Sequence, residues 1–309
     1  MKVIVAGGTG FLGRPLCRAL AAAGHTVVVL TRGQAMVPGA SRTVEWAPDR
    51  PAGSDPPDAW VREIDGADAV VNLAGAGLAD RRWTEARKDV LRASRILATR
   101  NLVAAVRAAR TRPSVFLSGS AVGFYGATGD AALDESFPPG SDFLATLCVH
   151  WEAEAHAAAA LGCRVVIVRT GIVLGRDGGV LKKLLPPFRL FVGGPIASGR
   201  QQMSWIHRDD WVALIRWALE RPSVSGVFNA TAPHAVTNRE FSRALGRALR
   251  RPSWLPVPAF ALRLLVGEIA DVALVAGQRV VPTRATDAGF TFQYPDIDAA
   301  MRAAIRETA

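Results

Sequence analysis

Residues 2–13, KVIVAGGTGFLG, constrain the fold of this chain more than any other stretch. Their first part is apolar and mostly β-branched, which is typical of a buried parallel strand. The spacing Gly7-x-x-Gly10-x-x-Gly13 follows at once, and a helix-forming stretch comes next. In such a unit the three glycines permit, in order, a tight turn, close approach of the backbone to a pyrophosphate, and close packing of the helix on the strand. The unit predicts a dinucleotide site at the N-terminus of the first helix, where free N–H groups stabilise anions. A glycine turn without a ligand is the alternative.

The end of the second predicted strand, residues 26–30, indicates which dinucleotide is bound. A fold of this kind that prefers NAD carries Asp or Glu there to bind the ribose hydroxyls. The first acidic residue of this chain is Glu45, and Thr31 and Arg32 close the strand instead. A guanidinium matches a 2′-phosphate, which a carboxylate would repel. We therefore expect NADP(H) rather than NAD(H), with an ordinary surface arginine as the alternative.

Length and composition limit the class of protein. A chain of 309 residues, half of them hydrophobic, allows one large α/β domain, alone or with a small annex. No stretch of 18 uncharged apolar residues is present, so we expect no transmembrane helix and no membrane partner. The chain begins directly with its first strand, from which we expect no leader peptide. The chain has three scattered cysteines, Cys17, Cys148 and Cys163, and their spacing is not that of metal ligands. We therefore expect a reduced cytoplasm and no metal site.

The formal net charge of +10 raises the question of nucleic-acid binding. The basic residues are mostly arginines spread along helices and turns, without a basic run or a recognition motif. We therefore expect no nucleic-acid partner. The charge can instead attract an anionic cofactor and substrate.

Alternating strands and helices predict a Rossmann-type, doubly wound parallel sheet. After residue 175 this rhythm changes, which predicts a smaller α+β substrate domain built from C-terminal segments. We expect residues 1–175, with about 205–235, to form the NADP-binding domain, and residues 176–204 and 236–309 the second module. Further strands are expected at 68–75, 114–118, 164–169 and 226–231, with helices at 84–109, 143–161, 180–190, 259–276 and 296–306. Residues 127–142 read as a Pro/Gly-rich excursion and 237–240 as a helix capping box.

Four further motifs carry a family resemblance: GGTGFLG at 7–13, NLAG at 72–75, SGSA at 118–121 and WIHRDD at 205–210. With them the chain resembles the extended short-chain dehydrogenases/reductases. Within that family it is similar to the atypical branch of NAD(P)-dependent epimerase family proteins (the SDR39U-like group). The resemblance covers essentially the full chain, including a C-terminal module from about residue 250.

The resemblance implies an NADP(H) site at matching positions of this chain. They are Gly7, Thr9, Gly10, Phe11, Leu12, Gly13, Thr31, Arg32, Leu73, Ala74, Gly75, Arg95 and Val173. Arg95 stands where extended members usually keep an asparagine, so we expect it to contact phosphate or ribose.

The catalytic pattern of the family is missing. Its members use Tyr-x-x-x-Lys on the helix after the fourth strand, where tyrosine is the acid or base and lysine lowers the pKa of that tyrosine. The best-aligned positions here run from Leu144 to Cys148, and neither tyrosine of the chain has lysine four residues on. Ser120 holds the family's serine position, and Tyr125 lies five residues further. These two are the first candidates for proton transfer.

We therefore expect an NADP(H)-dependent oxidoreductase or epimerase-like enzyme acting on a small carbonyl or hydroxyl compound, of which a sugar or polyol is one kind. The alternative is a non-catalytic NADP(H)-binding regulatory or interaction protein. A homodimer is a further possibility that the sequence leaves open.

Overall fold

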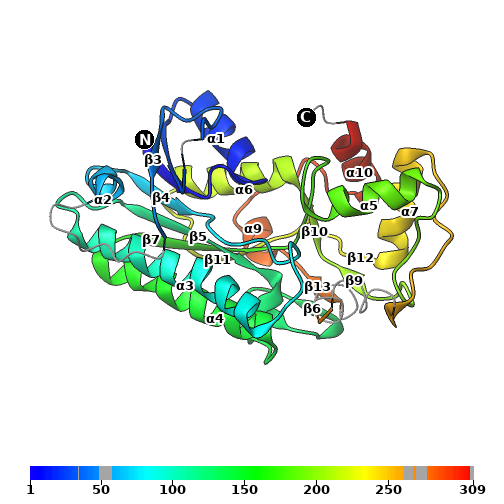
Figure 1. The fold of residues 1–309 in the computed structure, drawn as a ribbon. Coiled ribbons are helices and arrows are strands. Elements are labelled where there is room, and N and C mark those ends of the chain that lie inside the picture. Colours follow the sequence, from blue (N-terminus) through cyan, green and yellow to red (C-terminus); the bar gives the residue numbers. More distant parts are fainter. Residues whose placement is uncertain (34, 49–57, 261–266, 269–276, 307–309) are drawn as a thin grey trace.

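The computed structural model describes residues 1–33, 35–48, 58–260, 267–268 and 277–306. Its centre is a parallel sheet of seven strands in the order β11-β7-β5-β4-β1-β2-β3 (Figure 1). The strands are β1 (Lys2–Ala6), β2 (Thr26–Thr31), β3 (Arg42–Glu45), β4 (Ala69–Asn72), β5 (Val115–Ala121), β7 (Arg164–Thr170) and β11 (Gly226–Ala230). Strands β1, β2 and β3 run outward to one edge of the sheet. After β3 the chain returns to the centre, where β4 pairs with β1 on the side opposite β2.

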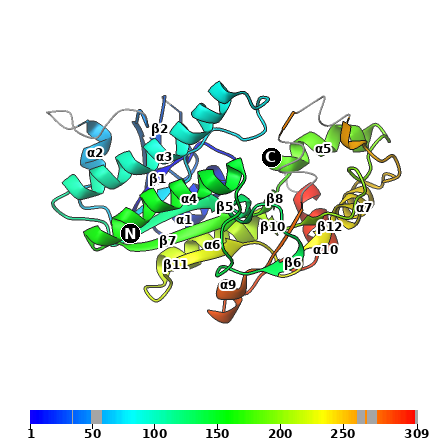
Figure 2. The ribbon, with the colours of Figure 1, turned by 90° about the horizontal axis from the view of Figure 1, so that it is seen from below.

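Helices cover both faces of this sheet, so the predicted doubly wound fold is confirmed (Figures 1 and 2). On one face lie α1 (Gly13–Ala22) and α6 (Arg208–Glu220), and on the other α2 (Ala59–Ile64), α3 (Glu85–Ala108) and α4 (Phe143–His156).

The alternation of side chains along the strands explains why two layers of helices are needed. Val3 and Val5 of β1 point into the core under α1 and α6, whereas Ile4 and Ala6 point into the core under α2, α3 and α4. All four are fully buried. Successive side chains of a strand point to opposite faces, so a strand that is apolar throughout requires cover on both.

A second, smaller core lies beyond the sheet, among α5 (Gly179–Arg189), α7 (Asn238–Leu249) and α10 (Ile297–Arg306). Trp205 and Phe241 are fully buried there, and α7 packs directly on α10. The predicted capping box is present: the Thr237 hydroxyl accepts from the Glu240 N–H, and the Glu240 carboxylate accepts from the Thr237 N–H at 2.7 Å. The domain boundaries expected from the sequence stay predictions.

Short elements complete the structure. They are β6 (Gly129–Leu133), β8 (Ile172–Leu174), β9 (Gln202–Met203), β10 (Trp205–His207), β12 (Val236–Thr237), β13 (Gln278–Val280), α9 (Thr283–Asp287) and the 3-10 helices η1 (Val122–Tyr125) and η2 (Ala157–Leu161). Strand β10 pairs with β8, β12 with β9, and β13 with β6.

Most sequence-based element predictions agree with these bounds. The excursion after β5 differs because it contains a strand, β6, whose partner β13 follows more than 140 residues later. The helix predicted at 259–276 falls mostly outside the described residues. Within the part of the chain that the structure describes, no helix combines the length and apolar character needed to cross a bilayer.

Candidate functional site

The glycine turn lies at the carboxyl end of β1, beside the turn that follows β4. Gly7 has a φ of 84°, and a Cβ atom there would come within 2.7 Å of the Leu73 carbonyl. A Cβ at Gly13 would lie 2.6 Å from the Gly8 Cα and would overlap the Gly7 carbonyl oxygen. Both glycines are thus required by close backbone packing, which brings the start of α1 against the end of β1.

The N-terminus of α1 has no competing anion. Its N-cap residue, Leu12, makes no side-chain cap, and the first turn contains no acidic residue. The first helical N–H groups therefore face the turn with the positive end of the helix dipole, which suits a phosphate.

A small apolar cluster lies next to this turn. Phe11, Leu12 and Leu73 are half-buried and pack on the core that contains Val173 of β8. A Cβ at Gly178 would overlap the Phe11 ring, so the residues before α5 lie directly against that ring. The structure thus brings together four predicted cofactor residues from three separate parts of the sequence.

Arg32 follows the last residue of β2. Its side chain is exposed, and among the described residues it makes no hydrogen bond, ion pair or ring contact. Thr31, at the end of the strand, is half-buried. A guanidinium without a protein partner at this position is able to receive an added phosphate.

The turn after β4 is held by buried polar contacts. The Asn72 side-chain amide donates to Thr99 Oγ1 at 2.7 Å. The Asn72 side-chain oxygen, Oδ1, accepts from the Ala74 N–H at 3.1 Å. Arg95 lies over the same turn, because a Cβ at Gly75 would be 3.1 Å from its Cζ atom.

Arg95 connects this turn with α4. Its Nη2 donates to the Ala76 carbonyl at 3.0 Å, and its guanidinium lies 5.4 Å from the centroid of the Trp151 ring. Burial lowers the pKa of Arg95 to about 10, so it stays cationic at neutral pH. It is a fixed positive charge between the cofactor turn and the cavity described next.

A cavity of about 290 Å³ opens beside Arg95. One wall comes from the end of β5 and from α4, and the other from β8, β9 and the start of β13. The polar side chains that line it are Arg95, Ser120, Thr170, Gln202, Ser204 and Gln278, and the apolar ones include Leu144, Leu147, Trp151 and Met203. A small neutral molecule with a few polar groups matches this lining.

Ser120 is the predicted catalytic residue that reaches the cavity. Its hydroxyl donates to Glu152 Oε1 at 2.6 Å. Glu152 is itself held by Arg169, whose Nε and Nη2 donate to its two oxygens at 2.9 and 2.8 Å. Burial acts to lower the pKa of Arg169, but the hydrogen bonds to Glu152 hold that pKa above its ordinary value. Ser120 therefore has a buried carboxylate directly behind it, which accepts its hydrogen bond.

Tyr125 lies on the other side of Arg169. Its hydroxyl donates to Asn229 Oδ1 at 2.7 Å and accepts from Arg169 Nη1 at 3.1 Å. Only 1% of the tyrosine is exposed, and the described residues that line the cavity do not include it. Burial raises the pKa of Tyr125, although the positive charge of the neighbouring Arg169 acts to lower it.

The Tyr-x-x-x-Lys positions are held by Leu144 and Cys148, and both line the cavity. The Cys148 thiol donates to the Ala121 carbonyl at 3.7 Å. Burial raises the pKa of Cys148 to about 11, so this thiol is protonated at neutral pH. It is therefore a weak nucleophile.

Two other titratable side chains near the site, Glu135 and His207, have structural contacts. Glu135 accepts from the N–H groups of Asn229 and Arg284, at 2.9 and 3.2 Å. His207 is fully buried at the N-terminus of α6, where its Nδ1 accepts from the Asp209 N–H at 3.2 Å. Burial lowers the pKa of His207 to about 4, so the ring is neutral at pH 7.

The sequence alone assigns no role to Glu152, Arg169 or Asn229. A signal for Arg169 was present, because an arginine at the end of an apolar strand requires a buried anion. No comparable signal points to Asn229, whose partner Tyr125 lies 104 residues away.

Comparison with known proteins agrees with this architecture. Residues 3–230 match the NAD dependent epimerase/dehydratase family, and residues 257–304 match a domain of unknown function, DUF1731. The epimerase family protein SDR39U1 homolog, chloroplastic, of Arabidopsis thaliana is 44% identical over 98% of this chain and 86% of its own.

Two solved structures illustrate the range of similarity. The crystal structure of human epimerase family protein SDR39U1 (isoform 2) with NADPH has a TM-score of 0.86 and 35% identity, over 99% of this chain and 100% of that one. A UDP-galactose 4-epimerase has a TM-score of 0.74 but 19% identity, over 98% and 97% of the two chains, so it shows the shared fold alone.

Proposed function

The chain belongs to the NAD-dependent epimerase/dehydratase family, and from this membership we propose that it is an NADP(H)-dependent oxidoreductase or epimerase-like enzyme. Its substrate would be a small carbonyl or hydroxyl compound of the size of a sugar or polyol. The observation that carries the proposal is the cavity of about 290 Å³, which is lined by Ser120 and Arg95 and has the buried Glu152 carboxylate behind Ser120.

The residues present fit NADP(H). The tight packing of Gly7 and Gly13 leaves backbone, not side chains, where a diphosphate would lie. Arg32 would hold the 2′-phosphate, since it has no protein partner among the described residues. Arg95 would approach the ribose or phosphate beside Gly75. A related protein, human SDR39U1, was crystallised with NADPH. When bound, the cofactor supplies hydride exchange with a carbon of the substrate.

Ser120 would handle the substrate proton. Because its own proton is directed at Glu152 Oε1, its oxygen is free to accept a hydrogen bond from a substrate hydroxyl. In the oxidative direction the hydroxyl proton would move to Ser120 Oγ while the serine proton moves to Glu152 Oε1. In the reductive direction both protons return along the same path. Such a pair supplies a general base without tyrosine or lysine.

Tyr125 would act as a positioning residue, because its contacts are with Arg169 and Asn229. It holds Arg169, and Arg169 in turn holds the Glu152 carboxylate against Ser120. The tyrosine therefore affects proton transfer through the placement of Glu152.

The experiment is steady-state NADPH oxidation by the purified protein with a panel of small aldehydes, ketones and keto sugars. Ser120→Ala should lower kcat by about 100-fold or more, which is the usual contribution of a general acid or base. Tyr125→Phe should lower kcat less and should shift the pH profile, since it acts only through Glu152. Turnover that is unchanged in Ser120→Ala would rule out the proposed role of Ser120.

A second candidate function is non-catalytic NADP(H) binding, in regulation or protein interaction. It is favoured by the replacement of the family's tyrosine and lysine positions by Leu144 and Cys148, two groups unsuited to proton transfer at pH 7. Tight NADPH binding without turnover of any panel member would support it. The expected cytoplasmic location and homodimer stay predictions, and the Arabidopsis relative is described as chloroplastic.

A further inference from the structure

The smaller core carries an exposed apolar cluster that is built from two segments. The turn after α5 contributes Leu190, Phe191 and Val192, and the segment after α7 contributes Trp254 and Leu255. Leu190 is 71% exposed, Trp254 66% and Phe191 52%. We call these five residues the apolar knob. Large apolar side chains gathered on a surface mark a site of interaction.

The backbone holds the apolar knob in place. Trp254 Nε1 donates to the Phe191 carbonyl at 3.1 Å, and the Trp254 N–H donates to the Gly193 carbonyl at 3.2 Å. Phe191 has a φ of 64°, a left-handed conformation that costs free energy in a residue with a bulky side chain. The fold thus uses a strained turn to present these side chains to the outside.

A groove rich in arginine adjoins the apolar knob. It has a volume of about 310 Å³, and Arg243, Arg247 and Arg250 line it from one face of α7 and its C-cap. Gly246, Arg251 and Ser253 complete the lining, and Arg247 forms an ion pair with Asp298 at 2.6 Å. We call this the arginine groove.

Two polar atoms of the arginine groove have unused bonding capacity. Arg251 Nε and Ser253 Oγ are buried and make no hydrogen bond with any described residue. The Arg251 guanidinium also lies 4.5 Å from the centroid of the Phe191 ring, so one side chain belongs to both surfaces. An anion that entered the groove would lie beside the Arg251 guanidinium and the apolar knob at the same time.

We propose that the apolar knob and the arginine groove together dock this protein on a membrane surface that carries anionic phospholipids. The phosphate of a lipid headgroup would bind in the arginine groove, and the knob residues would enter the boundary between headgroups and acyl chains. A soluble anion would use only the groove and leave the knob in water. This contact is with one surface of a bilayer, and it departs from the expectation of no membrane partner.

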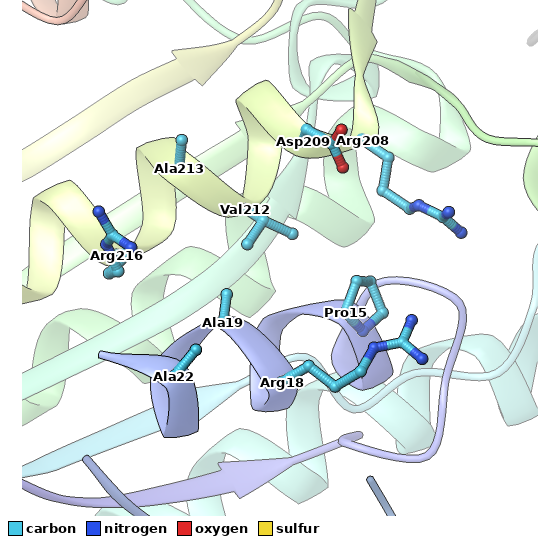
Figure 3. A pocket seen from close by; sticks show the side chains of 9 residues that line it. All are labelled: Pro15, Arg18, Ala19, Ala22, Arg208, Asp209, Val212, Ala213 and Arg216. Atoms are coloured by element: carbon cyan, nitrogen blue, oxygen red, sulfur yellow. The ribbon is translucent and has the colours of Figure 1, made fainter. Parts of the chain in front are cut away.

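The molecule contains a second arginine-lined groove that serves as an internal control. It lies between α1 and α6, and its lining includes Arg18, Arg208 and Arg216 together with small apolar side chains from both helices (Figure 3). Asp209 also lines it, and Arg208 forms an ion pair with Asp177. None of the large exposed apolar side chains within the described residues lines this groove. It offers positive charge without a large exposed apolar side chain in its lining.

The test is cosedimentation of the full chain with vesicles of phosphatidylcholine alone, or of phosphatidylcholine mixed equally with phosphatidylglycerol. We expect binding to the mixed vesicles only. Each basic residue near an anionic surface contributes about fivefold to binding, so Arg243→Glu with Arg250→Glu should weaken it about 25-fold or more. Phe191→Ser with Trp254→Ser should weaken it about tenfold or more, because both side chains would lose their apolar contact. Thermal unfolding of each variant checks that it is folded.

The matched control is Arg18→Glu with Arg216→Glu, which makes the same change of charge in the groove of Figure 3. An equal loss of vesicle binding in this control would overturn the proposal, because net charge alone would then explain the binding. Binding of inorganic phosphate without vesicle binding would overturn it too. So would a dimer in sedimentation equilibrium that the Phe191 and Trp254 changes dissociate, since the surface would then be occupied by a second copy.

Discussion

Replacing Glu152 by glutamine tests whether the buried carboxylate supports both the fold and the site. Glu152→Gln keeps the volume of the side chain and one oxygen for the Ser120 hydroxyl, so it opens no cavity. It removes the negative charge that faces Arg169, to which the carboxylate is bound through both of its oxygens. The perturbation is therefore electrostatic.

The expected magnitude follows from burial. The side chains of Glu152 and Arg169 are 7% and 5% exposed. Removing one partner of a buried ion pair leaves an uncompensated charge, which costs about 3–5 kcal/mol. The entropy of unfolding is about 2.1 cal/mol/K per residue, or roughly 0.65 kcal/mol/K over 309 residues. The Tm of Glu152→Gln should accordingly fall by about 5–8 °C.

Glu154→Gln is a matched control on the same helix. Glu154 pairs with Arg100, whose side chain is 57% exposed, and exposed pairs contribute about 1 kcal/mol or less. Scanning calorimetry at pH 7 should show a Tm shift of about 1.5 °C or less for this control. Equal Tm shifts in the two variants would refute the reasoning, because burial would then not distinguish the two ion pairs.

Three further predictions address the cofactor site and the cavity. Arg32→Glu should weaken NADPH binding by about 10- to 100-fold in isothermal titration and leave NADH binding nearly unchanged, since a charge-assisted phosphate contact is lost; equal losses for both cofactors would contradict this. Gly13→Ala should abolish NADPH binding and lower Tm, because the new Cβ would overlap the Gly7 carbonyl oxygen. Gly33→Ala should do neither, because a Cβ there has no neighbouring atom within 4 Å. The pKa of Cys148 is raised to about 11 from 9.0, so above pH 9 the folded state binds more protons than the unfolded state. The free energy of unfolding should therefore fall by up to about 1.4 kcal/mol per pH unit between pH 9 and 11. In urea titrations, Cys148→Ala should lack this part of the pH dependence.

The parallel sheet could be predicted because its determinants are local. Each central strand is a continuous apolar run that both helical layers cover, and the Gly7 to Gly13 spacing fixes the first crossover. The pair β6 and β13 could not be found in this way. These strands have five and three residues, which is too short to show an alternation of apolar and polar side chains. Their pairing across more than 140 residues leaves no local signal either.

The glycines, Arg32 and the residues after β4 could be identified as candidates for the same reason, because they are read as short segments, and their contact with the cofactor stays a prediction. The apolar knob could not be identified in this way. Its two parts lie about sixty residues apart, and neither is long enough to register as a hydrophobic stretch. A search for membrane contact that counts consecutive apolar residues therefore misses a surface formed by Phe191 and Trp254.

The proton-handling pair illustrates how much of a site depends on tertiary structure. Sequence comparison places Ser120 at the end of a strand and reports that tyrosine and lysine are missing from α4. Glu152 is one helical turn beyond Cys148, so it extends the same face of α4 on which lysine would stand. The fold turns that face toward Ser120, 32 residues earlier, and Arg169 donates to both oxygens of the carboxylate. Loss of the usual pair therefore leaves a buried base within 2.6 Å of a cavity-lining hydroxyl, and it is this distance, not the missing motif, that argues for an enzyme.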